Sequence, residues 1–144
     1  MPSSRKATTK IWGCSISAGL LAAALVAQEP APKPDDVADF MRAKLGHSQR
    51  VLEGLALEDY DLIARGAQEL ALASQASSWQ VLQTEEYARQ STEFRRSCDS
   101  LRTTAKAKNL DGAALAWMEV TMKCIQCHKY VRAADRQRGL EQDR

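Results

Sequence analysis

The chain has little of what strands and tight turns need. All four of its prolines lie at or before Pro34, and only seven glycines occur in 144 residues. Aromatic residues make up 6% of the chain, and runs of β-branched residues are absent. Strands are normally rich in β-branched and aromatic residues, and turns in glycine and proline. Everything after Pro34 is therefore predicted to be helical.

Charge is absent from one long stretch, residues 11–27, which is rich in Leu, Ala and Val. A basic start precedes it, and the polar residues 28–30 follow it. This order predicts a secretory signal peptide over residues 1–27, cleaved on export. A retained membrane anchor is the alternative, but 17 apolar residues are the lower limit for a span.

No excess of either charge remains once residues 1–27 are removed. They hold three basic residues and no acidic one, which leaves 17 Lys and Arg against 18 Asp and Glu, a net charge of −1. A nearly neutral chain gives no reason to expect binding to nucleic acid or stable association with a membrane. The remainder divides into a proline-rich lead-in at 28–34, one domain at 35–138 and a C-terminal tail at 139–144.

Four segments of the domain show helical periodicity, with expected ranges of 35–55, 58–76, 84–108 and 111–138. Asp35 or Asp36 is the expected N-cap of the first, and Asp111 that of the last. Short connections between helices of similar length predict an all-α protein, an antiparallel up-down-up-down four-helix bundle.

Apolar residues at intervals of three and four predict the buried face of each helix. On the first helix they are Val37, Phe40, Met41, Leu45, Val51, Leu52 and Leu55, with Lys44 and Ser48 as polar interruptions. On the third they are Tyr87, Ser91, Phe94, Cys98, Leu101 and Ala105, and on the fourth Ala114, Trp117, Thr121, Cys124, His128 and Val131. Cys98 is therefore expected to be a buried, inert thiol.

One short motif carries most of the chemical information: Cys124-Ile125-Gln126-Cys127-His128. The spacing Cys-x-x-Cys-His is the attachment signature of a c-type haem. Thiols about one helical turn apart can bond the two vinyl groups of one porphyrin, and the adjacent imidazole then falls under the iron as its proximal ligand. We therefore predict one covalently attached haem c on the last helix. Export to the periplasm agrees with this, because bacterial haem c is attached outside the cytoplasm.

Taken together, these features resemble the cytochrome c′ superfamily, including its six-coordinate, low-spin members. The resemblance covers residues 35–138 and rests on four helices, a single haem motif late in the last one, and Arg132 four residues after the haem histidine. Val131 stands where the family usually has an aromatic residue, and Tyr130 precedes it. Residues 40–45 are similar to the start of the family's first helix, which faces the distal side of the haem. Members of that family often pair through the outer faces of their first helices, so a homodimer is one expectation, although the sequence does not decide the oligomeric state.

The ligand opposite His128 decides the chemistry of the iron. Met41 is the main candidate, because Leu45 and Leu52 lie within about 40° of it on a helical wheel, in the middle of the predicted apolar face. His47, the other histidine of the chain, lies about 120° away and is the rival ligand. An open position is the third alternative. Arg132, one turn beyond His128, is expected to pair with a haem propionate or to shield the His128 edge.

Three functions remain open at this point. A soluble electron carrier with His/Met ligation, serving redox partner proteins, is the leading hypothesis, and no acid–base pair or nucleophile suggests an enzyme. An open sixth position would instead make a five-coordinate protein that binds NO or CO, as some members of the resembled family do. A haem-free dithiol or zinc site is the third hypothesis, and it would need His47 or Cys98 as a further ligand.

Overall fold

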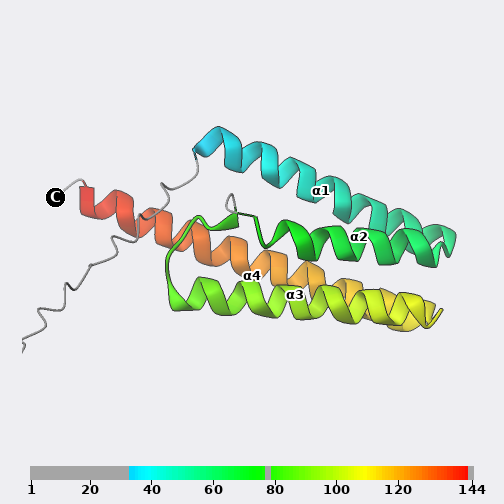
Figure 1. The fold of residues 1–144 in the computed structure, drawn as a ribbon. Coiled ribbons are helices and arrows are strands. Elements are labelled where there is room, and N and C mark those ends of the chain that lie inside the picture. The colour runs from blue at the N-terminus through cyan, green and yellow to red at the C-terminus, as the bar shows by residue number, and fades with distance from the viewer. Residues whose placement is uncertain (1–32, 77–78, 143–144) are drawn as a thin grey trace, which may run out of the picture.

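Four helices make up the part of the chain that the computed structural model describes, residues 33–76 and 79–142. They are α1 (Pro34–Leu57), α2 (Tyr60–Ala73), α3 (Glu85–Lys106) and α4 (Leu110–Gln142), and no strand occurs within these described ranges. The predictions of an all-α chain and of four helices are thus confirmed (Figure 1).

The helix ends follow from local capping residues. The Thr84 side chain accepts a hydrogen bond from the Tyr87 amide and caps α3, and Asp59 caps α2 in the same way through the Leu62 amide. Two predicted caps are wrong. Asp35 and Asp36 lie inside the first turn of α1, because the helix already begins at Pro34. Asn109, not Asp111, accepts the Gly112 amide hydrogen bond at the start of α4.

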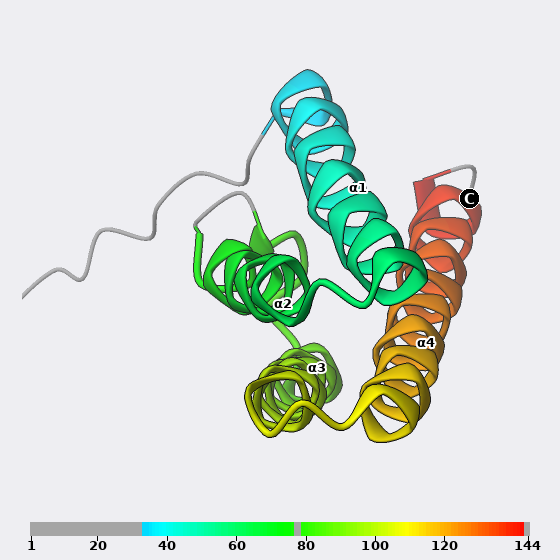
Figure 2. The same cartoon turned by 90° about the vertical axis from the view of Figure 1, so that its right-hand side faces the viewer.

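Each helix packs on the next one in the chain, whereas α1 and α4 make few contacts with each other. The α1–α2 and α3–α4 connections lie at one end of the molecule, and the α2–α3 connection lies at the other (Figure 1). Figure 2, viewed nearly end-on, shows the four helices around a common centre. The weak α1–α4 contact leaves space between the first helix and the last.

A glycine permits the close approach of α1 and α2. A Cβ on Gly66 would lie 2.7 Å from the Val51 Cγ2 atom and 3.2 Å from the His47 carbonyl oxygen, so no larger residue fits without a helix shift. Val51 and Ile63 are completely buried at this boundary. The contact fixes the rotation of α1, and with it the side chains that α1 turns toward the centre of the bundle.

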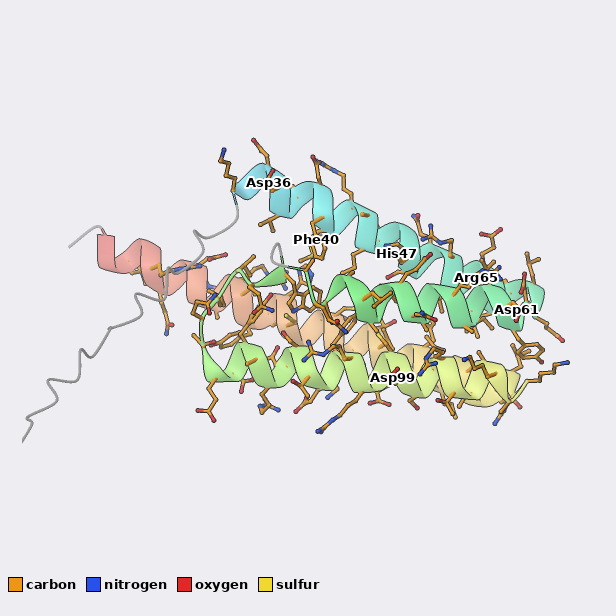
Figure 3. All side chains as sticks on the ribbon, viewed as in Figure 1. Asp36, Phe40, His47, Asp61, Arg65 and Asp99 are labelled. Atoms are coloured by element: carbon orange, nitrogen blue, oxygen red, sulfur yellow. The ribbon has the colours of Figure 1, made fainter. Side chains whose placement is uncertain are left out.

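Trp79, in the α2–α3 connection, is the largest fully buried side chain among the described residues. Its Nε1 donates to the Ser91 Oγ at 2.7 Å, and the Tyr87 hydroxyl donates to its carbonyl oxygen. The indole stacks on Phe94, with 5.3 Å between ring centroids, and meets Phe40 edge-on. Figure 3 shows Phe40 directed from α1 into the bundle. The connection is thus part of the core.

The predicted face of α3 is confirmed in full, and Cys98 is completely buried. The predicted faces of α1 and α4 are partly wrong. On α1, Leu45 and Leu52 are 58% exposed, while Lys44 is buried. On α4, Ala114 and Thr121 are exposed, and the buried line is Ala113, Ala116 and Val120. Both differences have one cause: α1 and α4 pack on α2 and α3 rather than on each other.

The predicted domain, residues 35–138, ends before the last helix does. The last helix continues to Gln142, so the expected tail at 139–144 is helical at its start. The predicted signal peptide at 1–27 and most of the lead-in at 28–34 lie outside the described residues. Among the residues that are described, no helix has both the length and the apolar character needed to cross a membrane.

Candidate functional site

The predicted attachment motif lies in the middle of α4, on the side that borders the space next to α1. Cys124 and Cys127 are half-buried and pack against the hydrophobic core, and neither is in a disulfide. His128 is more exposed but lines the same space. Because residues three and four apart share one helical face, α4 presents two thiols and an imidazole together.

Two cavities of about 410 and 440 Å³ lie between α1 and α4, on either side of this motif. Cys124 lines the first cavity and Cys127 the second, while His128, Met41 and Lys44 line both. Each volume lies within the range of about 300–1,000 Å³ typical of cofactor and ligand pockets. Apart from Lys44, the walls are largely apolar: they include Leu45, Trp117, Val37, Trp79 and Val81.

Met41 stands across this space from His128, on α1. It is partly buried and packs against the hydrophobic core. Its thioether is a soft, neutral donor that can bind iron without losing a proton. The structure therefore brings together four of the five predicted site residues: Cys124, Cys127, His128 and Met41.

Lys44, one turn after Met41, is the first of two site residues that the sequence did not reveal. Its side chain is only 6% exposed, and its Nζ lies 4.1 Å from the centroid of the Trp79 ring and 4.5 Å from that of Phe94. In the sequence Lys44 looked like a polar interruption of the α1 face. Its spacing of four from Phe40 and seven from Val51, both directed inward, is the signal that could have located it.

Burial and the Lys44 charge together set the protonation of the site. Burial raises the pKa of Cys124 and of Cys127, and the nearby Lys44 ammonium opposes part of that rise. Partial burial of the His128 ring lowers its pKa, and the charges of Lys44 and Arg132 act in the same direction. Before any modification both thiols are thus protonated near neutral pH, and the imidazole is neutral and able to donate a lone pair.

His47 lies away from this site. Its Nδ1 is 2.8 Å from the Glu69 Oε2 on α2, and the Arg50 guanidinium contacts both groups. Figure 3 shows His47 at the boundary between α1 and α2. His47 lines neither cavity beside His128. His47 is half-buried and bridges the two helices through the Glu69 carboxylate.

The residues that follow the motif lie in different surroundings. Arg132 is exposed, one turn beyond His128, and close enough for its charge to act on the imidazole. Val131 lines the second cavity. The Tyr130 hydroxyl lies 2.8 Å from the Thr84 Oγ1 at the start of α3, so this ring ties α4 to α3.

The zinc hypothesis finds no assembled ligand set. No group of three or more His, Cys, Asp or Glu side chains suited to a metal ion occurs within residues 33–76 and 79–142. Cys98 is near the motif, but complete burial raises the pKa of its thiol to about 12, which keeps it protonated and inert.

Trp79 is the second residue of the site that the sequence did not locate, because it lies in a connection and not on a periodic helix. It lines the second cavity and forms the floor beneath the Lys44 ammonium.

Comparisons of this chain with protein-family models, with curated protein sequences and with solved structures find no match.

Proposed function

We propose that this chain is an exported, periplasmic mono-haem c-type cytochrome that carries electrons between redox partner proteins. One observation carries the proposal: the thiols of Cys124 and Cys127 and the His128 imidazole share one side of α4, beside two apolar cavities, with the Met41 thioether across from them. In this proposal the protein is an antiparallel up-down-up-down bundle of the cytochrome c′ type, with haem c on its last helix.

The residues present fit such a group. Free, half-buried thiols in register on a helix can form two thioether bonds, and His128 and Met41 would hold the iron from opposite sides. The haem would supply a one-electron couple, and the His/Met ligand pair favours a high potential. The cavity walls would exclude water from the ring, and Arg132 would hold a charge near its edge.

Met41 is preferred to His47 as the second ligand because of where the two side chains lie. Met41 lines both cavities together with His128, whereas His47 is held at the α1–α2 boundary by Glu69 and Arg50. Moving His47 into the site would break that contact and turn α1 by about a third of a revolution.

A gas-binding protein with an open sixth position is the second candidate. The free volume on both sides of Met41 favours it, because a diatomic gas could enter there. Whether Met41 binds the iron decides between the two functions. A six-coordinate iron suits electron transfer, since little rearranges when the electron arrives, and a five-coordinate iron suits NO or CO.

Optical spectra of the purified ferric and ferrous protein test the proposal. We expect low-spin iron in both states, a weak red band from sulfur–iron bonding in the ferric protein, and slow uptake of CO. Met41→Leu should remove the red band. High-spin iron that binds CO rapidly in the wild type would favour the gas-binding function.

The attachment site has a matched control within the chain. Cys124→Ala combined with Cys127→Ala should leave haem that acid–acetone extracts, or none, whereas Cys98→Ala should leave the haem covalently bound. Haem that resists extraction in the double variant would place the attachment elsewhere.

A further inference from the structure

Lys44 is the one buried charged residue among the described parts of the chain. Burying an ammonium group is strongly unfavourable even after the protein relaxes, so it normally occurs only with a partner. Lysine is among the residues least often buried. A Lys at 6% exposure in the middle of α1 is therefore a feature that stability alone does not explain.

Within residues 33–76 and 79–142, no carboxylate offsets this cost. None of the ion pairs among the described residues includes Lys44. Asp135 is the only acidic residue of the described ranges that lines either cavity, and it pairs with Arg138. The Lys44 ammonium instead contacts the ring faces of Trp79 and Phe94, with its Nζ 4.1 and 4.5 Å from the two ring centroids. Cation–π contacts offset only part of the cost of burying an ammonium group.

The position of Lys44 places its amine among the groups that lie across from His128. Lys44 and Met41 lie three residues apart on α1, and both line the same two cavities as His128. Residues at this spacing are neighbours on a helix surface, so both side chains start from the same part of α1. Thus α1 offers two donors across from the imidazole of α4: a thioether and an amine.

We propose that Lys44 is a second ligand of the haem iron, which binds opposite His128 whenever the Met41 thioether does not. The inference rests on the proposed function, because it requires haem attached at Cys124 and Cys127. In the binding step the ammonium releases its proton to solvent and its nitrogen lone pair forms the bond to iron, with no change of oxidation state. The nitrogen favours ferric iron, and the softer sulfur favours ferrous iron.

The surroundings of the amine assist this step. Burial lowers the pKa of Lys44, and the neighbouring thiols of Cys124 and Cys127 oppose that effect. Lysines whose neutral form is favoured by burial commonly act as bases or nucleophiles, and the same lone pair serves a metal.

Four exported holoproteins test the inference: wild type, Met41→Ala, Lys44→Arg, and the Met41→Ala/Lys44→Arg double variant. Arginine keeps the positive charge but does not give up its proton, so it separates ligation from charge. Electron paramagnetic resonance and the near-infrared charge-transfer band of the ferric protein report the ligand type. Cyanide affinity reports how much of the iron is open.

We expect Met41→Ala to remain low-spin with a nitrogen-type signature, and the double variant to become high-spin. Ferric Met41→Ala should bind cyanide about tenfold or more weakly than the double variant, since only the open fraction of the iron can bind. If Lys44→Arg does not fold, Lys44→Leu takes its place as a neutral residue that cannot ligate. A nitrogen signature already in wild type and lost in Lys44→Arg would support Lys44 and overturn Met41 ligation.

Three results would contradict the inference, and they are distinguishable. If Met41→Ala is high-spin and binds cyanide as tightly as the double variant, Lys44 does not reach the iron, and the electron-carrier proposal is unaffected. If the nitrogen signature of Met41→Ala persists in the double variant, the ligand is not Lys44. If wild type carries no covalent haem, the proposed function fails and this inference fails with it.

Discussion

Two glycine-to-alanine substitutions should change stability in opposite directions. Gly66 and Gly46 both lie inside helices, where alanine is preferred to glycine by about 0.5–1 kcal/mol. At Gly46 a new Cβ would meet nothing within 4 Å, so Gly46→Ala should gain this amount. At Gly66 it would lie 2.7 Å from Val51 Cγ2 and 3.2 Å from the His47 carbonyl oxygen. The backbone atom cannot yield as a side-chain tip does, so α1 must move.

Overpacking of this kind costs about 1–3 kcal/mol, which leaves Gly66→Ala less stable by about 1–2 kcal/mol after the helical gain. With an m value of about 2 kcal/mol/M, in the middle of the usual range for urea, its urea midpoint should fall by about 0.5–1 M. Urea unfolding of the exported holoprotein, followed by far-ultraviolet circular dichroism, measures both variants. If both midpoints move in the same direction, the tight α1–α2 contact is not as described.

Three further predictions follow from other contacts. Trp79→Phe and Ser91→Ala should each destabilise the fold, and a double-mutant cycle should give a coupling of about 1 kcal/mol for the 2.7 Å hydrogen bond; additive effects would contradict it. Glu58→Gly should raise the thermal midpoint by a few degrees, because Glu58 has a left-handed φ of 54° at the end of α1; an unchanged midpoint would argue against that strain. The Arg50 hydrogen bond lowers the pKa of Glu69 below 4.5, so this carboxylate stabilises the fold above pH 4.5, and the contribution disappears as the pH falls through the lowered value. Acid unfolding curves of wild type and Glu69→Gln should therefore converge at low pH and separate above pH 4.5, and parallel curves would refute this pairing.

The face of α3 could be predicted completely because its apolar residues keep a regular interval between charged ones. The face of α4 could not, because apolar residues surround that helix: Leu115, Met118 and Met122 are all more than half exposed. With apolar residues on all sides, the face of α4 that is buried is determined by its tertiary contacts, here with α3. Tyr130 shows the same effect, since its hydroxyl contact with Thr84 depends on how α4 lies against α3.

On α1 the sequence placed Met41 on an inward face, and Met41 lines both cavities beside His128, but Lys44 was assigned to a polar interruption. Hydrophobic patterns treat lysine as exposed, yet the Gly66 contact turns α1 so that Lys44 and Val51 point inward together. The motif of residues 124–128 can be recognised from sequence alone, because the proposed haem attachment would fix its spacing by the chemistry of the group and not by packing. Trp79 was the hardest, because a residue in a connection has no periodicity to place it.

The mass of the intact exported protein tests the central claim most directly. The account predicts a polypeptide that begins near Gln28 and carries the added mass of one haem, retained under denaturing conditions. Exported protein with the mass of the polypeptide alone would contradict haem attachment at Cys124 and Cys127, and with it the proposed function.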